Sequence, residues 1–255
     1  MAEKLKSVLQ NLYQANRNQL SLFLKSLIFG VALFWAGLNN FSWASDLFFI
    51  AIAIFLYAPP LFENYTTLYA FLILLPAAIL GTRILNGSSL FIFGILSYSF
   101  IFYLLLGIKE YTFIKRSRLY YLAGMLIFYS IFIEFFLADK SELFLLKYGL
   151  VIFASFLLFR EWLTIITAFS FPKREILSAG VAAFLIAQLL WATALLPIGF
   201  ISSANLMLLF VFIITDFLLK HFTGGISKEF IFQQLIFFLA LAALIFWTSS
   251  WNLIL

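Results

Sequence analysis

The chain contains no cysteine, a single histidine, and aspartate only at Asp46, Asp139 and Asp216. Without cysteine it can form no disulfide, iron–sulfur cluster or thiolate metal site. The lone His221 excludes a haem held by two histidines and a zinc-binding H-E-x-x-H helix. The aspartates are too widely separated for the paired motifs that hold magnesium and diphosphate. We therefore expect no cofactor, no metal site and no enzymatic activity.

Charge is also scarce: 11% of the residues are charged, 65% are hydrophobic, and the mean hydropathy is +1.09. A soluble domain of 255 residues could not bury so much apolar surface. Lipid must be the solvent for most of the chain. The segments between apolar stretches are short, so we expect any function to lie within the bilayer, at its surfaces or in a partner.

About nine apolar stretches follow one another, each close to the ~20 residues that cross a bilayer. They are 22–38, 45–61, 66–82, 89–107, 119–137, 143–159, 176–198, 203–219 and 230–248. Lipid offers backbone groups no hydrogen-bond partner, so such segments become helices. The sequence predicts an all-α, polytopic transmembrane helical bundle.

Two regions allow alternatives. Residues 45–82 contain Pro76 and a connection without a basic residue, so they could form a re-entrant hairpin, which would leave seven spans. Residues 158–175 begin with polar side chains, which predicts a cytoplasmic interfacial helix ended by Pro172. A single long helix over 143–171 is the competing interpretation.

The basic residues indicate an orientation. When the spans alternate, only Arg83, Lys140 and Lys147 of the sixteen Lys and Arg residues fall on one side. By the positive-inside rule this predicts a cytoplasmic amino terminus and an external carboxyl terminus. A small polytopic chain without cysteine and rich in phenylalanine and isoleucine resembles many prokaryotic membrane proteins, so we expect the cytoplasmic membrane of a prokaryote. The net charge of +5 follows from the same rule, so we expect no nucleic-acid partner.

Residues 1–20 place apolar side chains such as Leu5, Leu9 and Leu12 on one helical face, opposite Lys4 and Lys6. This pattern predicts an amphipathic helix on the cytoplasmic surface, followed by one transmembrane domain over 21–255. A short solvated helix leading into the first span is the alternative.

Ionisable and amide side chains inside or beside apolar stretches are candidate sites, because they are costly in lipid. The candidates are Glu134, Lys147, Gln188, Asp216 and His221. Glu134 and Lys147 lie at similar depth before and after one outer turn, so they can form an ion pair. Asp216 falls in the opposite leaflet, within reach of Arg160 or Lys220, and could pair with a base or relay protons. Gln188, near Trp191, and the pair Gln233-Gln234 offer neutral amides that are expected to hydrogen-bond between helices, and contact with a substrate is the alternative.

Two further patterns indicate contacts. The cluster of Lys109, Lys115, Arg116 and Arg118 suits the headgroups of anionic lipids on the cytoplasmic face. Ala179, Ala183 and Ala187 repeat every fourth residue and allow another backbone to approach closely. The helix that carries them should lie centrally in the bundle or at a contact with a second copy or another membrane protein.

These observations favour a non-catalytic membrane component that acts through partners or lipid contacts. A small-solute transporter or lipid-handling protein is the alternative, and it predicts a polar cavity lined by the candidate residues. An intramembrane enzyme is the second alternative, and it would need a cluster of ionisable groups that the sequence places far apart.

Overall fold

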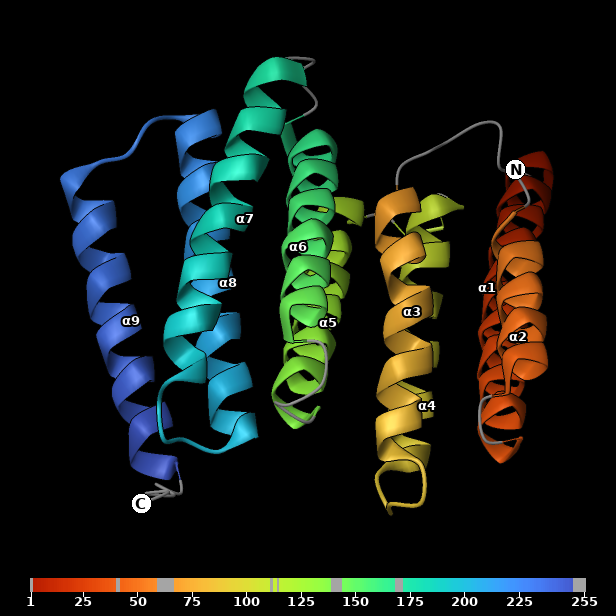
Figure 1. Ribbon diagram of the computed structural model, residues 1–255. Coiled ribbons are helices and arrows are strands. Elements are labelled where there is room, and N and C mark those ends of the chain that lie inside the picture. The colour runs from red at the N-terminus through yellow and green to blue at the C-terminus, as the bar shows by residue number, and fades with distance from the viewer. Residues whose placement is uncertain are drawn as a thin grey trace. The chain divides into compact units, whose positions relative to one another are not determined.

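The computed structural model describes the backbone of residues 2–39, 42–58, 67–110, 112–113, 115–138, 144–167 and 172–249, and its described side chains begin at residue 18. These residues form helices joined by short connections (Figure 1). The helices are α1 (Ala2–Leu38), α2 (Trp43–Tyr57), α3 (Leu68–Leu85), α4 (Phe91–Lys109), α5 (Arg116–Leu137), α6 (Phe144–Thr167), α7 (Pro172–Ala194), α8 (Phe200–Thr223) and α9 (Lys228–Thr248). Eight of them are long and apolar enough to cross a membrane, and α2 is a shorter apolar helix of 15 residues. The predicted all-α bundle of about nine apolar helices is confirmed.

The chain forms two compact units, Met1–Ala123 and Gly124–Leu255. The boundary falls inside α5, so the first turns of that helix belong to unit 1 and the rest to unit 2.

In unit 1, α1 and α4 pack antiparallel. The rings of Phe34 and Phe91 lie 6.0 Å apart at one end of this pair. At the other end Lys25 Nζ lies 2.5 Å from Glu110 Oε1. We call the end of this pair that carries Lys25 and Glu110 the basic end of unit 1.

Unit 1 has an aromatic core. The buried ring of Phe29 stacks on Phe102 at 4.3 Å and meets Phe49 edge-on at 5.1 Å. Phe71 from α3 lies 6.2 Å from Phe102. Each of the four helices contributes one of these rings, so burial of phenylalanine holds them together.

The helices α2 and α3 both run between the two ends of unit 1. Trp35, near the end of α1, contacts Phe48 in α2 at 5.0 Å. Tyr57, the last residue of α2, meets Lys109 at the basic end. From there α3 returns over 18 residues without a break at Pro76. A re-entrant hairpin would turn back halfway, so this arrangement favours the larger number of spans.

Helix α1 is continuous over 37 residues. The predicted boundary at residue 20 therefore lies within one helix, and the segment from Asn18 to Leu38 is its membrane-length part. The side chains of residues 1–17 lie outside the described ones. The surface position predicted for residues 1–20 stays a prediction.

In unit 2, α6 and α7 form an antiparallel pair. Tyr148 donates a hydrogen bond from its hydroxyl to the carbonyl of Ala187. Near the other end Thr164 Oγ1 lies 3.4 Å from Glu175 Oε2. The polar contacts therefore join the two helices at both ends.

Aromatic side chains join α5 to α6 and α9 to α8 in the described part of unit 2. Phe128 of α5 lies 5.3 Å from Phe159 of α6. Phe217 of α8 meets Phe230 of α9 at 5.3 Å. Ala242 is the one apolar side chain of α9 that is buried in unit 2, so most of that helix faces the surroundings.

The prediction of a separate interfacial helix over 158–175 is wrong. Helix α6 continues without a break to Thr167. The competing interpretation of one long helix over 143–171 therefore agrees with the structure over the described residues. Pro172 begins α7 instead of ending a helix. The first residue of a helix needs no N–H donor, so proline is well suited to that position.

Candidate functional site

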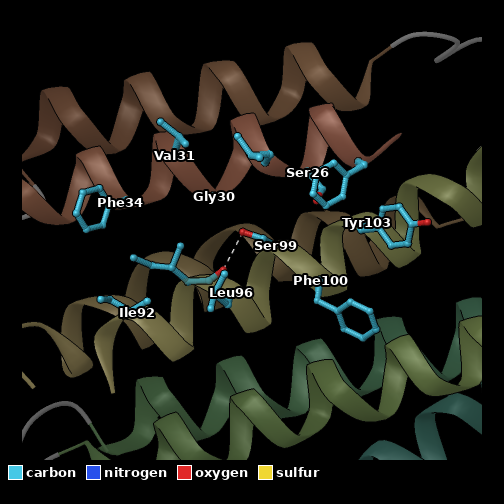
Figure 2. A pocket seen from close by; sticks show the side chains of 12 residues that line it. Ser26, Gly30, Val31, Phe34, Ile92, Leu96, Ser99, Phe100 and Tyr103 are labelled. Atoms are coloured by element: carbon cyan, nitrogen blue, oxygen red, sulfur yellow. Dashed lines mark hydrogen bonds between the residues drawn. The ribbon is translucent and has the colours of Figure 1, made fainter. Parts of the chain in front are cut away.

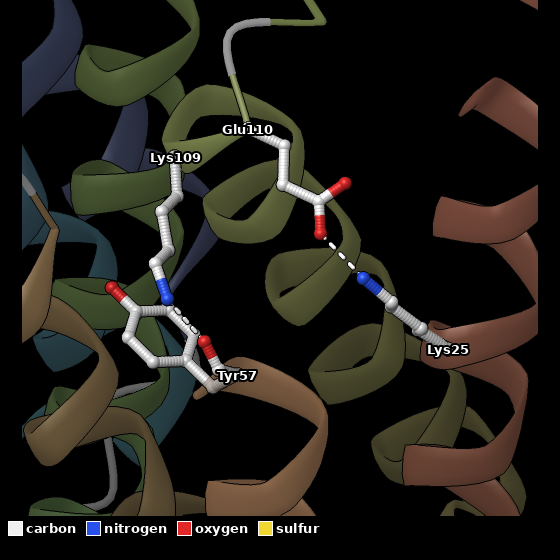
Figure 3. A network of polar contacts seen from close by, with 4 residues as sticks. All are labelled: Lys25, Tyr57, Lys109 and Glu110. Atoms are coloured by element: carbon white, nitrogen blue, oxygen red, sulfur yellow. Dashed lines mark hydrogen bonds and ion pairs between the residues drawn. The ribbon is translucent and has the colours of Figure 1, made fainter. Parts of the chain in front are cut away.

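A network of charged side chains lies at the basic end of unit 1 (Figure 3). Lys25 and Glu110 form the ion pair described above, and both remain partly exposed. Lys109 is buried, with 2% of its surface exposed. Its ammonium group donates a hydrogen bond to the carbonyl of Tyr57 and lies 3.9 Å from the centre of the Tyr57 ring.

The position of Lys109 follows from the direction of α2. Tyr57 is the last residue of that helix, where carbonyl groups lack intrahelical partners and the helix dipole is negative. An ammonium group there satisfies a carbonyl and is attracted by the electron-rich face of the tyrosine ring. Lys109 therefore caps α2 from the neighbouring α4.

Lys109 was predicted to contact lipid headgroups, and that contact stays a prediction, while the structure shows its side chain buried. Its ammonium group is turned into unit 1 because the end of α2 offers a carbonyl and a ring. Arg116 is half-buried, and its Nε donates to the carbonyl of Ile108 at 3.2 Å. Lys115 and Arg118 are exposed, so these two remain accessible to headgroups.

An apolar groove of about 620 Å³ runs between α1 and α4 in unit 1 (Figure 2). Its α1 side consists of Phe23, Ser26, Leu27, Gly30, Val31 and Phe34. Its α4 side consists of Ile92, Ile95, Leu96, Ser99, Phe100 and Tyr103. We call this feature the α1–α4 groove. None of the predicted candidate residues lines it.

The floor of the α1–α4 groove depends on small residues. A Cβ atom on Gly30 would lie 2.4 Å from Ser99 Oγ, so glycine is needed for the close approach of α1 to α4. Ser99 donates its hydroxyl to the carbonyl of Ile95 at 2.8 Å, which leaves that hydroxyl satisfied within α4. The wall is otherwise mostly carbon, so the groove suits a hydrocarbon.

Glu134, Lys147 and Gln188 lie in unit 2. Glu134 and Lys147 are both half-buried, on α5 and α6, and both have interaction partners. The next residues along each helix, Phe135 and Tyr148, have their rings 6.4 Å apart, so these parts of α5 and α6 are neighbours. An ion pair between Glu134 and Lys147 stays a prediction. Gln188 is exposed on the surface of unit 2.

Asp216 is half-buried on α8, and Gln234 Nε2 of α9 donates to its Oδ2 at 3.0 Å. The predicted hydrogen bonding of Gln234 between helices is thereby confirmed, and Asp216 is its acceptor. His221 lies a little over one turn beyond Asp216 and is exposed. Gln234 Oε1 is buried without a hydrogen-bond partner among the described atoms.

Ala179, Ala183 and Ala187 are buried within unit 2. They lie on the side of α7 that faces α6, because Glu175 and Ala187 of α7 both form hydrogen bonds with α6. The small side chains therefore allow α6 and α7 to approach closely. This agrees with a central position of α7 in its unit, and a contact with a second copy through these residues stays a prediction.

Sequence reasoning missed the Lys25–Glu110 pair, the role of Tyr57 and the groove. Lys25 did carry a signal, because a lysine within an apolar run needs an acceptor or acid nearby. The groove carries none, since its residues resemble those of any transmembrane helix. No family model matches the chain, and no match was found among curated proteins or solved structures.

Proposed function

We propose that the protein is a non-catalytic, multi-pass component of a prokaryotic cytoplasmic membrane that acts through contacts with anionic lipids and with partners. The observation that carries this proposal is the use of its polar side chains. Lys109 and Arg116 donate to carbonyls at helix ends, and Asp216 accepts from a neighbouring helix. Such groups stabilise the packing of helices, which is a structural role.

The exposed basic residues supply the lipid contact. Lys115 and Arg118 lie at the start of α5, immediately after the basic end of unit 1. A basic residue near an anionic membrane surface contributes about 1 kcal/mol of binding free energy. With Lys109 turned inward, we expect these two to provide most of the attraction in the segment 109–121.

A lipid-handling function is the second candidate, and the α1–α4 groove supports it. Its volume of about 620 Å³ falls within the range of small-molecule sites, roughly 300–1,000 Å³. Its wall is apolar and formed by two helices of membrane length. These properties fit a hydrocarbon chain better than a polar solute.

Thermal unfolding in lipid nanodiscs tests the proposed lipid contact. Anionic lipid should raise the unfolding temperature relative to zwitterionic lipid. Replacing Lys115 and Arg118 together by glutamine should remove most of that increase. The control Arg83→Gln changes an exposed charge at the last turn of α3 and should keep the increase. An unchanged response of the double variant would contradict the proposal.

A further inference from the structure

We propose that the α1–α4 groove holds an acyl chain of an anionic phospholipid whose headgroup lies beside Lys25. This inference rests on the proposed function, because it names the lipid class and the place of one of its contacts. It goes beyond a general attraction to charged lipids, since it assigns a binding site to twelve lining residues of two helices.

The groove is about as long as one leaflet is thick. On α1 it extends from Phe23 to Phe34, which is about 16 Å along a helix that rises about 1.5 Å per residue. One leaflet supplies about half of the ~30 Å hydrocarbon core. An acyl chain lying along α1 would therefore contact the groove over most of its length.

The lining residues also fit a flexible chain. Leu27, Val31, Leu96 and Phe100 line the groove and are each about half exposed, so they offer hydrocarbon to an occupant from both helices. The few polar lining atoms include Ser99 Oγ, which is already bonded within its own helix. A solute that needs several hydrogen bonds would find few partners here.

Charge at one end of the groove selects the headgroup. Lys25 is the neighbour of the lining residue Ser26, and its ammonium group has three donors, one of which is used by Glu110. The segment that follows α4 adds exposed Lys115 and Arg118. This is the side on which the positive-inside rule places the cytoplasm and its anionic lipids. A phosphate group beside Lys25 would thus accept from the donors of its ammonium group that Glu110 does not use.

Photo-crosslinking of the full-length protein in vesicles tests the inference. The probes are two phospholipids with the same photoactivatable acyl chain, one carrying an anionic glycerol headgroup and the other a zwitterionic choline headgroup. Labelled residues are identified by mass spectrometry of the peptides. We expect about fivefold more labelling of the groove residues by the anionic probe, which corresponds to ~1 kcal/mol for one basic residue.

Two tryptophan variants test the position of the acyl chain. Leu96→Trp fills the groove, since Leu96 lines it and is 60% exposed. Phe93→Trp is the matched control on the same helix, because Phe93 is 68% exposed and does not line the groove. Leu96→Trp should abolish the preferential labelling, and Phe93→Trp should preserve it.

Two charge variants test the position of the headgroup, and they should act in opposite directions. Lys25→Gln removes the proposed phosphate partner and should lower the preference for the anionic probe about fivefold. Glu110→Gln removes a repelling carboxylate that also competes for Lys25, and should raise the preference. If the pair were only structural, both variants would lower stability alike and neither would change the preference.

The outcomes separate this inference from the proposed function. Equal labelling by both probes, or labelling unaffected by Leu96→Trp, overturns the groove site. The proposed function survives that result if Lys115 and Arg118 still account for stabilisation by anionic lipid in nanodiscs. Crosslinks between two copies of the chain that Leu96→Trp removes would also overturn the inference, because the groove would then hold a helix.

Discussion

Replacing Lys109 by methionine should destabilise the protein although it removes a charge from an apolar interior. Methionine is similar in length and apolar, so it keeps the packing around the side chain. It cannot donate to the carbonyl of Tyr57, which lies at the end of α2. The variant therefore isolates the hydrogen bond and the contact with the ring.

The expected magnitude follows from three contributions. A hydrogen bond from a charged donor is worth about 1.5–3 kcal/mol. A desolvated ammonium group over an aromatic ring adds up to ~2 kcal/mol, and the structure places Lys109 Nζ 3.9 Å from the ring centre. Relief of the cost of burying the ammonium group offsets part of this loss. We expect a net loss of about 2 kcal/mol in the free energy of unfolding, or ~4–8 °C in unfolding temperature for a chain of this size.

Reversible unfolding in mixed micelles measures the effect. Lys115→Met is the matched control, because Lys115 is exposed and only six residues further along the chain. It should change the free energy of unfolding by no more than about 0.5 kcal/mol. A double-mutant cycle with Tyr57→Leu should show a coupling of about 1 kcal/mol with Lys109→Met, because the leucine lacks the ring. Equal stability of the two lysine variants would refute the assigned contact and return Lys109 to the headgroup region.

The orientation can be tested because the chain has no native cysteine, so one introduced cysteine is the only thiol. In intact cells a membrane-impermeant maleimide should label Ser88→Cys, which follows α3. It should label Ser117→Cys, at the start of α5, only after the cells are permeabilised. The reverse pattern would contradict the predicted orientation. Asp216→Leu should lower the free energy of unfolding by about 1 kcal/mol, because it leaves the amide of Gln234 without its acceptor. Adding Gln234→Leu should recover part of that loss. Additive losses measured by unfolding in mixed micelles would show that the two side chains are not coupled.

The helices could largely be predicted from the sequence because lipid constrains the backbone so strongly. An apolar stretch of sufficient length has one way to satisfy its N–H and C=O groups, and that is to be helical. Even Pro76, which weakened the prediction for 66–82, lies inside the continuous α3. Helices in a bundle tolerate proline because neighbouring groups satisfy the freed carbonyl.

The failure at residues 158–175 has a physical cause. Arg160 and Glu161 made the sequence polar enough to suggest a separate surface helix. In the structure Glu161 is buried and Arg160 is half-buried, and both have interaction partners. Hydropathy counts a charged residue as unfavourable wherever it falls, but its true cost depends on partners that only the packed helices provide.

The α1–α4 groove could not be predicted for a related reason. Gly30 and Ser99 are separated by 69 positions in the chain, and their contact depends on the register between α1 and α4. A one-turn shift of α4 would place other side chains opposite Gly30. Apolar composition specifies that the helices associate, whereas their register determines which gaps remain between them.

The basic residues at the basic end of unit 1 have two different physical roles. Helices α2 and α4 both finish at this end, so their C-terminal carbonyls attract cations there. Lys109 and Arg116 donate hydrogen bonds to these carbonyls. Lys115 and Arg118 are exposed at the surface. Lys109→Met should therefore lower stability without altering orientation, whereas replacing Lys115 and Arg118 should weaken the lipid contact with little change in helix packing. If Lys109→Met instead changed the side on which Ser117→Cys is labelled, the buried lysine would be needed for orientation, and the distinction between capping and surface residues would fail.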